Sequence, residues 1–231
     1  GSEVILSDMG SANKTVVNGT TLNAGAPFKL KNNDQIKVGN VIMKFLEKGN
    51  IEAFTNRELN EKVTRDALTG AYTKGALLER GPEVMKRSET LNEELSLIVF
   101  DIDFFKKIND QFGHSAGDYV LRELARVVST KLTRSEDFFA RYGGEEFVII
   151  LINNPLKTAM EVAERIRTTI QGTHFEFEGR VIPTTISIGV ATKLKDEDRW
   201  EAFFKRADEA LYASKQGGRN RVTMATGNFL T

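Results

Sequence analysis

The pattern of apolar and polar positions changes near residue 50. Residues 3–48 are rich in Asn, Gly, Thr and Val, and their apolar residues form short alternating runs, which are typical of β-strands. Asn18-Gly19 and Asn33-Asp34 supply turns between the runs. Residues 1–48 are therefore predicted to be an all-β fragment, with strands at 15–17, 28–30, 35–38 and 41–46.

Residues 49–65 consist mainly of charged helix formers. Their sparse apolar positions are Ile51, Phe54, Leu59 and Val63, a spacing that is only loosely heptad-like. We predict a linker helix here, and a dimerising stalk is the alternative.

From residue 66 to residue 231 helical and extended patterns alternate, as in a domain of mixed α and β structure. The continuous apolar run 96–100 predicts a buried strand, and the periodicity of 116–132 predicts an amphipathic helix. The remaining predicted elements are a hairpin at 138–152, a helix from 155 to about 170, strands near 175 and at 182–191, a helix around 200–214 and a strand near 221–224.

Composition narrows the class of protein. With 231 residues and 40% hydrophobic content, the chain has room for one large domain or two modest ones. Lys plus Arg equals Asp plus Glu at 32 each, so no net field attracts a nucleic-acid polymer or a membrane surface. The chain has no cysteine and no apolar run near the length of a membrane span. We expect a cytoplasmic protein, and Gly1-Ser2 resembles the remnant of a cleaved tag, so the natural protein is expected to begin earlier.

Two acidic motifs carry the candidate chemistry. Gly143-Gly144-Glu145-Glu146 lies between two apolar runs and predicts a hairpin with carboxylates at its tip, where glycine lets a ligand approach the backbone. Asp101 and Asp103 follow the buried strand 96–100. Together these acids would make an all-oxygen cluster suited to Mg²⁺ or Mn²⁺. The alternatives are an acidic surface hairpin and a solvated strand end.

A candidate phosphate site follows the second motif. Lys106 lies beside the amides of Phe104 and Phe105, at a turn that enters a helix. Its charge and the backbone donors could hold a polyphosphate together.

Eight short motifs occur in a fixed order along the chain, at 66–70, 101–110, 112–114, 117–118, 141–147, 187–191, 207–212 and 215–220. Taken together, these motifs resemble those of the GGDEF family of diguanylate cyclases, and the resemblance covers about residues 59–225. Ala71, Thr73 and Lys74 depart from the family pattern, at no catalytic position. The resemblance implies an α/β (α+β) domain at 66–231 with a palm-like, mostly antiparallel central sheet flanked by helices.

The family joins two GTP molecules into cyclic di-GMP and two pyrophosphates, with the help of metal ions. Each 3′-hydroxyl attacks the α-phosphorus of the other GTP. If each domain holds one GTP, two copies must face each other, so the resemblance implies a homodimer in a bacterial cytoplasm. The alternative is a catalytically idle receptor or signalling adaptor that binds cyclic di-GMP.

The resemblance also assigns roles to the acids at the two motifs. Asp101, the carbonyl of Ile102 and Glu145 would hold Mg²⁺ or Mn²⁺. Glu146 would be a further ligand or would help to deprotonate the hydroxyl, and these two roles stay open.

Asn109 and Asp118 match the positions that read guanine, where Asp accepts from N1–H and Asn donates to a ring acceptor. The other residues that match substrate contacts are Phe104, Phe105, Lys106, Gly143, Gly144, Lys215 and Arg219.

Arg134-Ser135-Glu136-Asp137 resembles the inhibitory RxxD site at which the family binds its product. Arg134 and Asp137 can both bond a guanine edge, and Arg165 would complete the site from a second domain. An ordinary surface ion pair is the alternative.

Residues 6–19 and 33–39 resemble the second half of a forkhead-associated (FHA) domain, a β-sandwich that binds phosphothreonine peptides. Asn13 matches a peptide-contacting residue, and Lys14 stands where that family usually has Gly. Because the half with the principal phosphate contacts is missing, we expect phosphopeptide binding only in the full-length protein. The fragment would expose unpaired strand edges, so we expect it to be poorly ordered or to pair with another chain.

Overall fold

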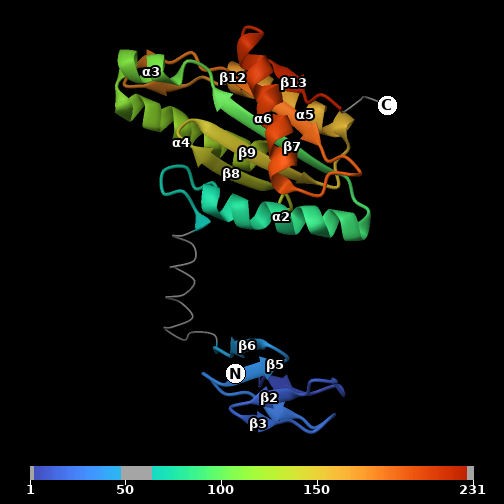
Figure 1. Ribbon diagram of the computed structural model, residues 1–231. Helices are drawn as coiled ribbons and strands as arrows, with labels where there is room; N and C mark the ends of the chain where they lie inside the picture. The colour runs from blue at the N-terminus through green and yellow to red at the C-terminus, as the bar shows by residue number, and fades with distance from the viewer. Residues whose placement is uncertain (1–2, 48–63, 228–231) are drawn as a thin grey trace. The chain divides into compact units, whose positions relative to one another are not determined.

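The computed structural model describes residues 3–47 and 64–227 (Figure 1). The chain forms two compact units, Gly1–Glu61 and Lys62–Thr231. All but the last two residues of the predicted linker helix at 49–65 lie outside the described residues. Each unit is described by itself below.

The N-terminal unit is all-β, as predicted. It has a sheet of order β3-β2-β5-β6 and a separate pair of β1 and β4, all antiparallel. Val17, Leu22, Leu30 and Ile36 form its buried core. The strands are β1 Ile5–Leu6, β2 Thr15–Val17, β3 Thr20–Thr21, β4 Phe28–Lys29, β5 Gln35–Val38 and β6 Val41–Lys44.

The C-terminal unit is built on a five-stranded sheet of order β13-β12-β7-β9-β8. Every pair is antiparallel except the β12–β13 pair, so the prediction of a mostly antiparallel sheet is confirmed. All eight residues of the central strand β7 are buried, which explains its continuous apolar run. The sheet strands are β7 Leu95–Ile102, β8 Phe138–Gly143, β9 Glu146–Ile152, β12 Ile186–Thr192 and β13 Val222–Met224, and a small hairpin joins β10 Glu176–Phe177 to β11 Arg180–Val181.

Helices cover both faces of the sheet (Figure 1). Because side chains alternate along a strand, Ile98 and Phe100 of β7 enter the core under α4 and α5, while Leu97 and Val99 enter the core under α2 and α6. The helices are α2 Lys74–Leu91, α3 Phe105–Phe112, α4 His114–Lys131, α5 Leu156–Gly172 and α6 Trp200–Gln216. Within the described ranges, no helix is long and apolar enough to cross a membrane.

Helix α2 was not predicted from the sequence. Pro82 lies inside it, preceded by Gly81, and both residues disfavour a helix interior. The structure gives the reason for the glycine. A Cβ on Gly81 would lie 2.5 Å from the indole of Trp200, so α2 packs directly on the first residue of α6.

Candidate active site

The acidic hairpin forms as predicted between β8 and β9. Gly143 pairs with Glu146, which leaves Gly144 and Glu145 as the two turn residues. Gly144 has a φ of +52°, as expected for the first central residue of a type II′ turn. A Cβ on either glycine would meet no described atom within 4 Å. The turn therefore presents open backbone to a ligand.

Arg141 supports this turn from β8. Its Nε donates to the carbonyl of Gly144 at 2.9 Å, and its Nη1 lies 3.1 and 3.3 Å from the carboxylate oxygens of Asp66. Asp66 also accepts hydrogen bonds from the N–H and hydroxyl of Thr69. Burial acts to raise the pKa of Asp66, but the hydrogen bonds from Thr69 and Arg141 outweigh it and hold the pKa below its usual value. The sequence-based site contained neither Arg141 nor Asp66.

Asp101 lies directly opposite Glu146 on the neighbouring strand and is 8% exposed. The N–H of Ile102 bonds the carbonyl of Glu145 at 3.3 Å, so the predicted metal-binding residues lie around one end of β7. Burial raises the pKa of Asp101 to about 6, and the charges of Glu145 and Glu146 act in the same direction. Lys215 opposes them, with its Nζ 2.9 Å from Oδ2 of Asp101. This environment favours a cation beside Asp101.

The donor chemistry of this end of β7, carboxylates and a backbone carbonyl, suits Mg²⁺ or Mn²⁺. The ammonium of Lys215 on Asp101 shows that the position accepts a positive charge. Across residues 3–47 and 64–227, however, no three His, Cys, Asp or Glu side chains are arranged to hold a metal ion. The predicted cluster of Asp101, Asp103, Glu145 and Glu146 is therefore not formed by the side chains as they lie.

The prediction that Asp103 belongs to the acidic cluster is wrong. Its carboxylate is buried and accepts hydrogen bonds from the hydroxyls of Thr185 at 2.7 Å and Ser187 at 2.6 Å, and from the N–H of Asn220 at 3.0 Å. Strand β7 ends at Ile102, so Asp103 lies just beyond the strand. Asp103 instead ties the strand end to β12 and to the loop after α6.

The predicted phosphate-binding residues lie around the start of α3. Phe104 precedes this helix with a φ of +56°, and the residue is 50% exposed. The guanidinium carbon of Arg219 lies 4.4 Å from the ring centre, and Nζ of Lys107 lies 4.5 Å from it. Lys106 is exposed on the first turn. Lys215, by contrast, is engaged with Asp101.

The predicted guanine-binding residues lie on two helices that pack against each other. Asn109 is on α3 and Asp118 is on α4. The helices are joined at Gly113, which has a φ of +90°. Asn109 and Asp118 thus lie on two helices that follow each other directly and contact each other.

Comparison with known proteins identifies the family of the C-terminal unit. The family model described as "Diguanylate cyclase, GGDEF domain" matches residues 63–221. The chain belongs to the GGDEF family. Diguanylate cyclase A of Treponema denticola is 44% identical over 180 residues, which cover 77% of this chain and 48% of that protein. The chain thus spans about half the length of this relative.

Solved GGDEF structures share the fold. The GGDEF domain of DgcB from Caulobacter crescentus, in complex with c-di-GMP, gives a TM-score of 0.67 at 35% identity and covers 70% of this chain and 95% of that chain. The active GGEEF domain of a diguanylate cyclase from Vibrio cholerae gives 0.62 at 35% identity, with 66% and 96% covered. The recognition of a GGDEF domain from its motifs is therefore confirmed.

The FHA family model matches residues 1–39, so this resemblance is confirmed as well. Asn13 and Lys14 line a polar cavity of about 440 Å³ together with Lys37. Lys14 adopts a φ of +52°, a conformation that glycine accepts without strain. Lys14, which replaces the usual FHA glycine, therefore has a left-handed backbone conformation of the kind that glycine adopts readily.

In the GGDEF domain, the RxxD residues form the loop between α4 and β8. The N–H of Arg134 donates to Oδ2 of Asp137 at 2.8 Å. The other carboxylate oxygen of Asp137 is buried without a partner among the described residues, and burial raises the pKa of this side chain. Arg165 lies on α5, where it borders a different cavity.

Proposed function

We propose that this protein is a diguanylate cyclase, which condenses two GTP molecules into cyclic di-GMP and two pyrophosphates at a homodimer interface. The observation that carries the proposal is the buried Asp101, which lies opposite Glu146 beside the open Gly144-Glu145 turn. An ionised carboxylate is costly at a buried strand end unless a cation compensates it. Such an arrangement is expected in a site that binds metal and phosphate.

A divalent ion, Mg²⁺ or Mn²⁺, would be held by Asp101, the carbonyl of Ile102 and Glu145, with Glu146 as a further ligand or an aid to deprotonation. When bound, it would stabilise the negative charge that develops on the α-phosphate and the leaving oxygen.

The protein's own residues bind and orient the substrate in this proposal. Asn109 and Asp118 bind the guanine edge, and Lys106 and Arg219 hold the outer phosphates. The amides of Phe104 and Phe105 contribute donors at the start of α3. The nucleotide lies against the backbone of Gly143 and Gly144, where no Cβ obstructs it. The ammonium of Lys215 contacts Asp101, and in this proposal it also interacts with a bound phosphate.

Two copies of the chain are required by the stoichiometry. Each 3′-oxygen loses its proton and forms a bond to the α-phosphorus of the other GTP, and the bond to pyrophosphate breaks. With one GTP in each domain, the attacking hydroxyl comes from the partner, and a two-fold axis relates the two half-sites. Holding both nucleotides in place makes the attack effectively intramolecular.

The test is Glu145→Ala, assayed for cyclic di-GMP with GTP and Mg²⁺. We expect no product, with an unchanged circular dichroism spectrum and urea midpoint. Glu209→Ala is the matched control, because Glu209 is an exposed carboxylate on α6, and it should turn over normally. Normal turnover by Glu145→Ala would contradict the metal assignment.

A cyclic di-GMP receptor without turnover is the second candidate. The unpartnered oxygen of Asp137 favours a ligand at the RxxD loop, because a buried acceptor without a donor is costly. In the cyclase this loop would bind product and inhibit, with Arg165 contributed by a second domain. Tight binding of cyclic di-GMP without any turnover of GTP would favour the receptor. A phosphothreonine peptide is proposed as a partner of the full-length protein alone.

A further inference from the structure

The side chain of Asn109 on α3 reaches the backbone of α4 at Gly117, a buried residue in the first turns of α4. A Cβ on Gly117 would lie 2.0 Å from Oδ1 of Asn109, 3.0 Å from its Cγ and 3.2 Å from Cζ of Phe105. Carbon and oxygen atoms that are not bonded do not approach to 2.0 Å. The carboxamide of Asn109 therefore occupies the space that the Cβ of any other residue would take.

Helix propensity does not explain this glycine. Glycine destabilises a helix interior relative to alanine, because it loses more backbone freedom on folding. Gly117 has no positive φ that would require glycine. The close approach of Asn109 is therefore the structural requirement at position 117.

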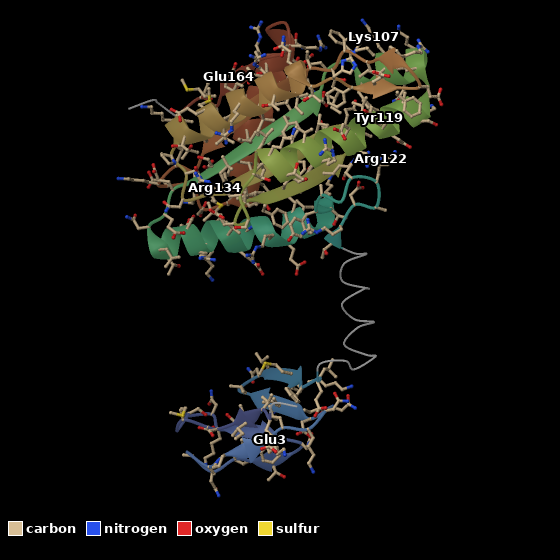
Figure 2. All side chains as sticks on the ribbon, turned by 180° about the vertical axis from the view of Figure 1, so that it is seen from behind. Glu3, Lys107, Tyr119, Arg122, Arg134 and Glu164 are labelled. Atoms are coloured by element: carbon tan, nitrogen blue, oxygen red, sulfur yellow. The ribbon has the colours of Figure 1, made fainter. Side chains whose placement is uncertain are left out.

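The notch at Gly117 also determines where Asn109 can point. The carboxamide fills the notch at Gly117, which directly precedes Asp118 on α4. Lys107 and Tyr119 mark these two helices at the same end of the domain in Figure 2. The relative position of Asn109 and Asp118, which are proposed to bind guanine, thus depends on the contact between α3 and α4.

We propose that Gly117 is a positioning residue for nucleotide recognition: its missing Cβ holds the Asn109 carboxamide beside Asp118, so that both contact one guanine. This inference rests on the proposed function, because it assumes a guanine nucleotide between α3 and α4. A Cβ at position 117 would expel Asn109 from the notch and remove its hydrogen bond to the base.

The test is a double-mutant cycle with Gly117→Ala, Asn109→Ala and the double variant, titrated with 3′-deoxy-GTP and Mg²⁺. This nucleotide has no attacking hydroxyl and cannot cyclise. Loss of one hydrogen bond to the base predicts affinity about 10-fold weaker for each single variant. The double variant should bind no more weakly than Asn109→Ala, because both changes remove the same contact.

Gly75→Ala is the matched control. Gly75 is also a helical glycine, but its Cβ would meet only Oγ1 of Thr73 at 3.8 Å, so affinity should be unchanged. In GTP turnover, Gly117→Ala should raise KM about 10-fold and keep kcat near the wild-type value. A purely structural role would lower kcat through the folded fraction and leave KM alone.

Stability provides a readout that does not depend on any nucleotide. Gly117→Ala should lower the urea midpoint in the wild-type background and raise it in the Asn109→Ala background, where the notch is empty and alanine favours the helix. Wild-type affinity in Gly117→Ala, or losses that add in the double variant, would overturn the inference. If the wild type does not bind 3′-deoxy-GTP, the proposed function fails, and the urea midpoints still decide whether Asn109 fills the notch.

Discussion

Removal of the Arg141 guanidinium should both destabilise the GGDEF domain and slow the proposed reaction. Arg141 bonds the carbonyl of Gly144 and the carboxylate of Asp66, and the two side chains are 17% and 25% exposed. Hydrogen bonds to charged groups contribute about 1.5–3 kcal/mol each when buried, and partial exposure reduces this value. We expect Arg141→Met to lower the free energy of unfolding by about 2 kcal/mol.

The assay is urea unfolding of Arg141→Met, Asp66→Asn and the double variant, followed by circular dichroism. The ion pair predicts a coupling energy of about 1 kcal/mol between the two positions. Arg141→Lys keeps the charge but cannot bond both partners from a planar fork, so it should recover only part of the loss. Product formation should fall further than the folded fraction does, because the turn that carries Glu145 loses its support.

The stabilisation by the Asp66–Arg141 ion pair should depend on pH. The pKa of Asp66 is lower in the folded protein than its ordinary value of 3.8. The stabilisation is therefore complete above about pH 4 and is lost as the pH falls through the folded pKa. The difference in stability between wild type and Asp66→Asn should narrow in acid. Equal stability of wild type and Arg141→Met at neutral pH, or no coupling between the two positions, would refute the reasoning.

Three further predictions follow from other sites. Burial raises the pKa of Asp101 to about 6, so the folded state loses stability as the pH rises from about 4 to 6. In metal-free buffer, Asp101→Asn should therefore raise the urea midpoint at pH 8 but not at pH 4. The same variant should abolish turnover of GTP. Arg134→Ala should remove calorimetric binding of cyclic di-GMP and leave initial turnover unchanged, and retained affinity would exclude this site. Gly189→Ala should cost about 3 kcal/mol in unfolding experiments, because its Cβ would lie 2.1 Å from the carbonyl of Ala207; stability equal to that of Gly75→Ala would contradict the close packing of α6 on β12.

The sheet could be predicted from the sequence because burial and pattern coincide there. Strand β7 is buried on both faces, and β9 has five buried residues in a row, so their apolar runs have no helical period. Helix α2 could not be predicted. Its Gly81 and Pro82 disfavour a helix locally, and the contact that justifies Gly81 is with Trp200, which is remote in the sequence. Tertiary packing outweighs local preference in that element.

The candidate site shows the same limit. The two acidic motifs were found from residue type and position at strand ends, and the ladder pairs Asp101 with Glu146. Arg141 was passed over because its partner Asp66 lies 75 positions away, and no local pattern records that pairing. A guanidinium two residues before the Gly143-Gly144 pair is the signal that was present, since it can reach the carbonyl of Gly144 in the turn.

Asp103 shows why an acid next to a site need not be a ligand. Three non-glycine residues near it have positive φ, namely Phe104 at +56°, Arg219 at +65° and Asn220 at +42°. Such conformations are strained and persist only where the surroundings impose them. Asp103 accepts the N–H of Asn220, and Arg167 donates to the Asn220 side chain at 2.8 Å. The carboxylate therefore stabilises the loop that places Arg219 against Phe104. In the proposed cyclase, Asp103 would thus support the phosphate-binding residues through the backbone of this loop.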